Sequence, residues 1–223
     1  MYPLPRLSGW FARLCAPLAH KRVNHRTLLA GTINVAFLNG ALTLTAVDDL
    51  TQAGVVGLKN DNVIVLTSSA PGVVTLSGAG ETFALAGVGP FNGVTSIKLD
   101  LKEGNDQVTL SAINMSGAVT ILGGEGDTSV AGGGADQVDI EQLNLGTETR
   151  LEKSFTVNGG AGADVINIGR DSDPHDFARF FDAVAINGGT GIDRLHFRNL
   201  APDGLKSNLF GIVPTTATIE VLL

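Results

Sequence analysis

The sequence predicts an all-β protein, a right-handed parallel β-helix (β-solenoid) with irregular coils and one short helical insertion. Three observations support this fold class. Apolar and polar residues alternate in short stretches, glycine-rich corners close these stretches, and a phrase of strand plus corner recurs along the chain. The composition agrees, because 29 glycines among 223 residues, with 43% hydrophobic and 5% aromatic residues, are typical of many tight turns around a continuous core.

Residues 1–31 are predicted to be a basic leader or targeting segment that precedes the β-solenoid of residues 32–223. The first thirty residues contain five basic residues and no acidic one. Their apolar stretch, Leu14–Ala19, is short and contains Pro17, so the export route stays open. The segment Val23–Leu29 resembles, through its R-x-L-L half, the L-E-P-R-x-L-L segment of large surface and secreted proteins of planctomycete-type bacteria. That resemblance implies an extracellular or cell-surface location.

The body of the chain is acidic. Residues 31–223 contain ten basic and 22 acidic residues, a net charge of −12. Such a surface repels phosphate backbones, which argues against nucleic acid as a partner, and it is compatible with divalent cations. The only cysteine, Cys15, excludes a disulfide within the chain. No run of about 18 apolar residues is present, so the sequence predicts no transmembrane helix.

The strands begin at Thr32 with alternating apolar residues, and Asn39-Gly40 gives a hairpin-type turn signal. The recurring phrase, a short strand with its glycine-rich corner, then occurs at four places. Successive starts are 22, 36 and 29 residues apart, and no helix is expected between most of the strands, which argues against βαβ units. A weaker copy starts at Val74. Ile97 starts another weaker copy, and the three clear copies start at Val119, Phe155 and Val184.

The corners resemble the nonapeptide G-G-x-G-x-D-x-U-x of hemolysin-type (RTX) calcium-binding repeats, in which U is a large apolar residue. Residues 159–167 and 188–196 match every fixed position, and residues 131–139 lack only the first glycine. Partial copies lie at residues 104–108, 61–63 and 123–128, and the corners are clearest over residues 101–197. The resemblance implies calcium ligation by these corners, with Asp136, Asp164, Asp193, Asp106, Gly160, Gly162, Gly189 and Gly191 as the candidate metal-site residues.

The residues themselves leave two roles open for the corner aspartates. Glycine permits the positive φ of a tight corner, and the short carboxylate of aspartate either caps N–H groups of the turn or binds a cation. RTX repeats recur every nine residues, whereas Asp136, Asp164 and Asp193 are 28 and 29 residues apart. Paired half-sites for calcium are therefore not guaranteed, and calcium is a tentative cofactor.

The segment from Asp171 interrupts the strand pattern. Asp173 before Pro174 is a helix-start signature, and Phe177, Phe180 and Phe181 would share one helical face, which predicts a short lid-like helix. The acids and histidine of this segment lack the spacing of an EF-hand calcium loop.

No catalytic motif is present in the sequence. G-x-S-x-G, H-E-x-x-H and Walker patterns are missing. The enzyme alternative is a polysaccharide lyase or hydrolase, because many parallel β-helix proteins have those activities. Its best feature is the outward alternation of Lys98, Asp100 and Lys102, which is also what a solvated strand face shows.

The function predicted from the sequence is an exported, non-enzymatic structural or adhesive β-solenoid module, stabilised by calcium through its Gly/Asp corners. The expected partners are calcium ions and either a cell-surface polysaccharide or a matrix protein.

Overall fold

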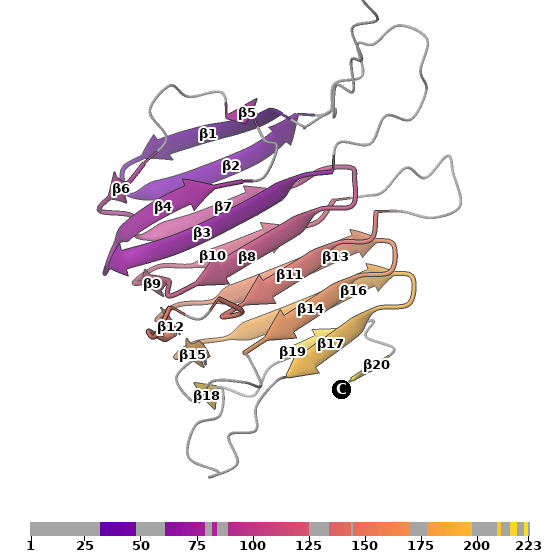
Figure 1. Ribbon diagram of the computed structural model, residues 1–223. Coiled ribbons are helices and arrows are strands. Elements are labelled where there is room, and N and C mark those ends of the chain that lie inside the picture. Colours follow the sequence, from indigo (N-terminus) through magenta and orange to yellow (C-terminus); the bar gives the residue numbers. More distant parts are fainter. Residues whose placement is uncertain are drawn as a thin grey trace, which may run out of the picture.

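The computed structural model describes residues 32–47, 61–78, 82–83, 89–124, 134–143, 145–169, 178–197, 209–210, 215–217 and 221–222. Every regular element in these residues is a β-strand, and the strands form three sheets (Figure 1). The predicted all-β class is therefore confirmed. The first strand begins at Thr32, and the predicted leader, residues 1–31, lies outside the described residues.

Sheets A and B have eight strands each, and sheet C has four. Sheet A has the order β19 (Thr215–Ala217), β16 (Val184–Thr190), β13 (Phe155–Ala161), β10 (Val119–Leu122), β7 (Ser96–Asp100), β2 (Ala41–Val47), β1 (Thr32–Leu38) and β5 (Thr82–Phe83). Sheet B has the order β20 (Val221–Leu222), β17 (Arg194–Phe197), β14 (Val165–Ile168), β11 (Gln137–Ile140), β8 (Gln107–Ser111), β3 (Val63–Ala70), β4 (Val73–Ser77) and β6 (Phe91–Asn92). Sheet C has the order β18 (Leu209–Phe210), β15 (Ala178–Phe180), β12 (Thr149–Leu151) and β9 (Asn114–Met115).

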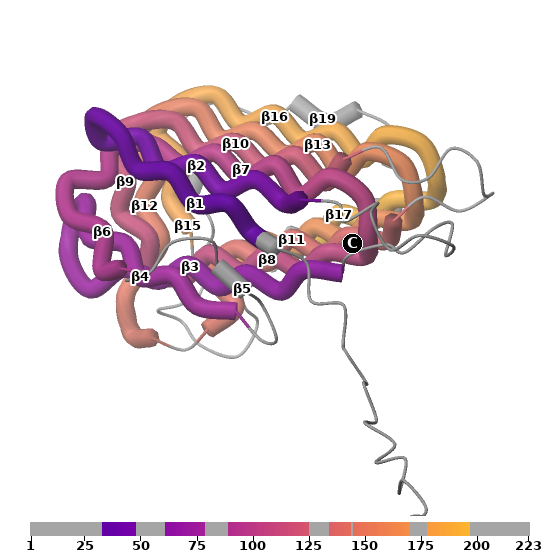
Figure 2. The backbone as a smooth tube through the Cα atoms, turned by 90° about the horizontal axis from the view of Figure 1, so that it is seen from above, coloured from indigo at the N-terminus to yellow at the C-terminus, as the bar shows by residue number. Residues whose placement is uncertain are grey.

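From β7 onward the chain visits sheets A, B and C in turn. From β10 onward each strand pairs in parallel with the strand three places earlier, so β10 lies on β7 and β13 lies on β10. Seen from above, sheets A and B lie on opposite sides of the molecule, and sheet C closes one side (Figure 2). The register places the three clear copies and the weaker copy at Ile97 side by side, with Ile97, Val119, Phe155 and Val184 in one row.

The predicted right-handed parallel β-helix is wrong, because the sheets are mixed. β1 is antiparallel to β2, β3 is antiparallel to β4, and β4 is antiparallel to β6. The turn at Asn39-Gly40, with φ of 50° and 81°, is the physical reason for the first pair. A two-residue turn joins only antiparallel strands, whereas a parallel connection needs a longer crossover. Val74 lies in β4, which is antiparallel to β3, so this weaker copy is outside the row formed by the other copies.

The predicted helical insertion is also wrong where the structure describes it. Residues 171–177 lie outside the described part, but Ala178–Phe180 form β15, paired in parallel with β12. Ala178 and Phe180 are buried and Phe181 is exposed, which is the alternation of a strand. Phenylalanine spacing over so few residues does not separate helix from strand. The described residues include no helix that could cross a membrane.

The core consists of apolar rows that run across the sheets. Phe155 and Phe180 are fully buried side chains whose ring centroids are 5.3 Å apart, and this contact joins sheets A and C. Where strands pair in parallel, one apolar residue lies above another at the strand spacing of about 4.8 Å, so each layer buries the apolar face of the next. The rows of sheets A and B include Leu42, Ile97, Val119, Phe155 and Val184, and Ile64, Val108, Val138, Ile166 and Leu195.

Candidate functional site

Four aspartates stand at the corner where the chain enters sheet B. Asp106, Asp136, Asp164 and Asp193 each precede a strand of sheet B, namely β8, β11, β14 and β17. Because these strands pair in parallel and in register, the four residues lie one above another. We call them the aspartate column. They are the four aspartates that the sequence nominated as metal ligands.

Hydrogen bonds run along the column from each backbone to the next carboxylate. The N–H of Asp106 donates to Oδ1 of Asp136 at 2.9 Å, and the N–H of Asp136 donates to Oδ1 of Asp164 at 2.9 Å. The N–H of Asp164 donates to Oδ1 of Asp193, also at 2.9 Å. Each carboxylate therefore satisfies an amide of the preceding layer, which is the turn-capping role that the sequence left open. The metal role is not tested by these contacts.

Asn62, which sequence reasoning missed, takes the position before Asp106 and is the first member of the column, with an amide in place of a carboxylate. Both the backbone N–H and the side-chain Nδ2 of Asn62 donate to Oδ1 of Asp106 at 2.7 Å. The sequence instead nominated Asp61, which lies one position away and accepts the N–H of Asn105 at 2.7 Å on the exposed side. The signal that finds Asn62 is the pairing of Val63 with Gln107, because it sets the residue before each strand opposite the other.

Glycines make room for each carboxylate. A Cβ added to Gly159 would lie 2.2 Å from Oδ2 of Asp164, and one added to Gly188 would lie 2.2 Å from Oδ2 of Asp193. The aspartate side chain thus occupies the space that a side chain at the first glycine would need. This contact explains why the nine-residue corner motif has glycine at its first position and aspartate at its sixth.

The remaining corner glycines stack on one another with positive φ. Gly160 and Gly189 have φ of 100° and 103°, and Gly162 and Gly191 have φ of 143° and 139°. A Cβ on Gly189 would lie 1.7 Å from the carbonyl oxygen of Gly160, and one on Gly191 would lie 1.4 Å from that of Gly162. These four candidate residues are therefore brought together as backbone layers without side chains.

The column is buried, and burial alters its titration. Asp106, Asp136, Asp164 and Asp193 are 1%, 4%, 1% and 0% exposed. Burial raises the pKa of Asp136 from the ordinary value of 3.8 to about 8, against the lowering effect of the hydrogen bond from Asp106. Burial likewise raises the pKa of Asp164 to about 6, and the charge of Asp193 adds to this. Protons therefore bind to the column more tightly in the folded chain than in the unfolded chain.

Metal binding by the column would need carboxylate oxygens beyond those that accept the amides. Oδ2 of Asp164 has no hydrogen-bond partner among the described residues. In that part of the chain no group of three acidic, histidine or cysteine side chains is close enough to hold one ion. A calcium ion would need six to eight oxygens, so backbone carbonyls of the corner would have to supply most of them.

Glu141 is a second buried acid that sequence reasoning missed. It is fully buried at the corner between β11 and sheet C, with φ of 60°. Its Oε2 accepts the N–H of Ala112 at 3.0 Å and the hydroxyl of Thr149. No repeated phrase marks this corner, so the sequence carried no signal for it.

A polar row crosses the outer face of sheet B. Thr109, Asp139, Asn167 and His196 are successive partners in its parallel register. Oδ1 of Asp139 accepts Nδ2 of Asn167 at 2.7 Å. Within the described chain, Nε2 of His196 is buried without a hydrogen-bond partner. The hydrogen bond between Asp139 and Asn167 therefore links two neighbouring layers of this row.

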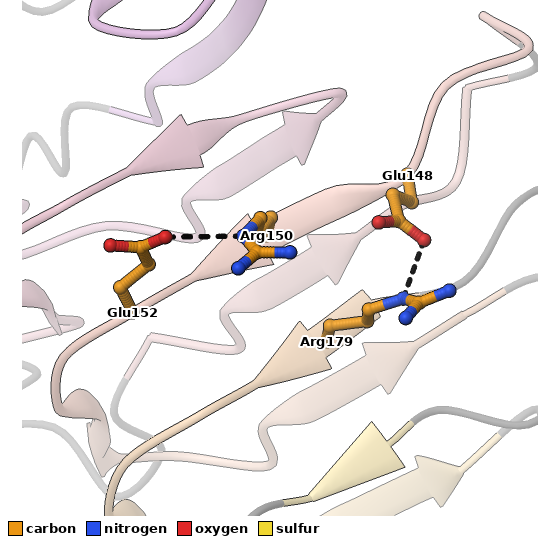
Figure 3. Close-up of polar contacts among 4 residues, drawn as sticks. All are labelled: Glu148, Arg150, Glu152 and Arg179. Atoms are coloured by element: carbon orange, nitrogen blue, oxygen red, sulfur yellow. Dashed lines mark hydrogen bonds and ion pairs between the residues drawn. The ribbon is translucent and has the colours of Figure 1, made fainter.

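The outer face of sheet C has two arginine–glutamate pairs on neighbouring layers (Figure 3). Nε of Arg179 lies 2.6 Å from Oε2 of Glu148, and Nε of Arg150 lies 3.2 Å from Oε1 of Glu152. The guanidinium of Arg150 also lies 4.2 Å above the ring of Phe181. Because each arginine already faces a carboxylate, this face is balanced in charge.

Fold and site together define an all-β protein in which parallel layers are joined through glycine–aspartate corners. No family model, curated protein or solved structure matches the chain.

Proposed function

We propose that the chain is an exported, non-enzymatic structural or adhesive module of the cell surface or extracellular space, built on hemolysin-type Gly/Asp corners. The single observation behind this proposal is the hydrogen bond from each backbone N–H of the aspartate column to the next carboxylate. The residues that define the motif hold one layer to the next. The R-x-L-L resemblance of the N-terminal segment supports the location.

The column supplies specificity of stacking more than net stability. A buried amide that loses its acceptor costs about 1–3 kcal/mol. Burying carboxylates also costs free energy, so the column is not a simple gain. However, only the residue in register can reach the amide of the layer below. If one layer slipped by one residue against the next, the buried amide and the buried carboxylate would both lose their partners. The contact therefore favours one strand register between layers along the whole module.

Substitution of Asp164 tests the proposal. Asp164→Ala removes the acceptor of the Asp136 amide and should lower the free energy of unfolding by about 1–3 kcal/mol in urea denaturation. Asp164→Asn keeps an acceptor oxygen and removes the buried charge, so it should stay within about 1 kcal/mol of the parent.

The matched control for this substitution is Asp182→Ala. Asp182 accepts only the N–H of its neighbour Ala183, on the exposed side of the chain. Its loss should cost less than about 0.5 kcal/mol. If Asp164→Ala were as stable as the parent and Asp182→Ala, the column would have no structural role and the proposal would fail.

Calcium stabilisation is the second candidate. The observation in its favour is Oδ2 of Asp164, which is buried without a hydrogen-bond partner among the described residues. A cation there would offset the repulsion between neighbouring carboxylates. Millimolar calcium should then raise the melting temperature, a chelator should lower it, and magnesium should have a smaller effect. An unchanged melting temperature would assign the column to ion-free capping.

A further inference from the structure

A groove lies on the outer face of sheet A, beside the glycine corners. It has a volume of about 740 Å³. Its lining comes from the ends of β7, β10, β13 and β16, which lie side by side in both views (Figures 1 and 2). Because these are four successive layers, the groove runs along the stacking direction. Its side chains are Asp100, Lys102, Glu103, Leu122, Asn158, Ala161, Asn187 and Thr190.

The floor of the groove is glycine backbone. Gly124, Gly160 and Gly189 line it, with φ of 104°, 100° and 103°. A Cβ on Gly124 would lie 1.6 Å from the carbonyl oxygen of Lys102, and one on Gly160 would lie 1.6 Å from that of Gly124. No larger residue fits at these positions. The corner glycines that let the layers stack closely are therefore also the floor of the groove.

The walls present amide, carboxylate and ammonium groups at fixed places. Nδ2 of Asn187 donates to Oδ1 of Asn158 at 3.1 Å, which fixes the plane of the Asn158 amide. Nζ of Lys102 lies 2.9 Å from Oδ2 of Asp100. An ammonium has three donors and a carboxylate has two acceptor oxygens, so this ion pair still offers hydrogen bonds to a ligand.

The lining excludes two common classes of ligand. Asp100 and Glu103 outnumber Lys102, so an anionic polymer meets net negative charge. An extended peptide that adds to a sheet needs unpaired backbone groups. β10 and β13 are paired on both sides, so the sheet face offers side chains only. What remains favoured is a neutral ligand rich in groups that both donate and accept hydrogen bonds.

We propose that this groove binds a neutral polysaccharide along the stacking direction. The proposal rests on the adhesive role proposed above and gives it a ligand class. Hydroxyl groups match the amides, carboxylate and ammonium of the walls, and a linear chain of sugars fits a groove that spans four layers. Leu122 and Ala161 offer small apolar contacts to sugar rings. No aromatic ring of the described residues lines the groove, so we expect one site to bind weakly, with a Kd of about 1 mM. Adhesion then comes from many sites on one polymer.

Titration of the full chain with hexasaccharides tests the proposal. The probes are cellohexaose, maltohexaose and chitohexaose as neutral ligands, and an oligogalacturonate as the anionic comparison. NMR shifts of the amides of Gly124, Gly160 and Gly189 report on the floor. At least one neutral probe should give saturable shifts there, without release of new reducing ends. The oligogalacturonate should bind at least tenfold more weakly.

A pair of wall substitutions provides the second arm. Asn158→Ala with Asn187→Ala should weaken binding of the neutral probe at least tenfold while the melting temperature stays close to that of the parent. Asn92→Ala is the matched control, because Asn92 is exposed on β6 of sheet B, away from the groove, and its side-chain Nδ2 donates to the carbonyl of Pro90 at 3.4 Å. It should leave binding unchanged.

Three results would overturn the inference: no saturable shift with any neutral probe, equal binding by the Asn158/Asn187 double variant, or stronger binding of the oligogalacturonate. These results are distinct from failure of the proposed function. The aspartate column is tested by stability alone, so a chain destabilised by Asp164→Ala that binds no sugar would keep its structural role and lose only its ligand.

Discussion

The Oδ1 oxygen of Asp193 lies 2.9 Å from the backbone nitrogen of Asp164, although 29 residues separate the two in the chain. The same contact is repeated in the layers below, from Asp136 to Asp164 and from Asp106 to Asp136. Asp193, which the sequence suggests as a metal ligand, therefore accepts a hydrogen bond that links two layers. This repeated contact predicts how the molecule responds to pH, to substitution and to hydrogen exchange.

Stability should increase as the pH falls from about 8 to about 5. The folded pKa values of Asp136 and Asp164 are raised to about 8 and about 6, above the ordinary 3.8. A raised acid pKa means that the folded state binds the proton more tightly. The resulting stability is fully present below about pH 3.8 and is lost as the pH rises through about 6 and then about 8.

Urea midpoints measured across this pH range check the prediction. Asp136→Asn removes the group with the larger shift and should flatten the dependence between about pH 6 and pH 8. The carboxylates that face Asp136 are those of Asp106, Asp164 and Asp61, and they remain in this variant. A midpoint that rises with pH over the same range would show that the column does not take up protons on folding.

Gly160→Ala should be far more destabilising than Gly146→Ala. Both glycines have positive φ, 100° and 69°, so both substitutions incur a backbone cost of about 1–2 kcal/mol. A Cβ at Gly160 would also lie 1.6 Å from the carbonyl oxygen of Gly124, whereas one at Gly146 meets nothing within 4 Å. The steric clash should add about 1–3 kcal/mol or prevent folding. Thermal unfolding of the two variants measures the difference, and equal losses would mean that the layers do not stack as closely as described.

Phe180→Ala should cost about 3–5 kcal/mol, because its side chain is 1% exposed and packs on Phe155 across sheets C and A. Phe181→Ala, one residue further, removes a side chain that is 45% exposed and lies under Arg150. Its loss should cost about 1 kcal/mol or less. Chemical denaturation separates the two. A larger loss at Phe181 would contradict the burial pattern of β15, in which Phe180 and not Phe181 belongs to the core.

Much of the fold could be predicted from the alternating pattern and the repeated corner. Ile97, Val119, Phe155 and Val184 lie in register as the aligned phrases require. The antiparallel strands were missed although the sequence contains their signal at Asn39-Gly40. A hairpin turn dictates local antiparallel pairing even when the rest of the chain pairs in parallel.

The site could be predicted in position but not in detail. Asp136, Asp164 and Asp193 were found because glycines flank them at fixed spacing. Asn62 was missed because an aspartate stands beside it and matches the motif, so only strand register identifies the true first member of the column. Glu141 was missed because one partner, Ala112, comes from another layer and the other, Thr149, lies eight residues further along the chain, so no motif marks the contact.

Amide hydrogen exchange in Asp193→Ala tests the central claim most directly. The account predicts that the amide of Asp164 loses its protection, because its acceptor is gone, while the amide of Asp136 keeps the acceptor on Asp164 and stays protected. Exchange at Asp164 that matched the unsubstituted chain would contradict the account, because the carboxylate of Asp193 would then not hold that layer.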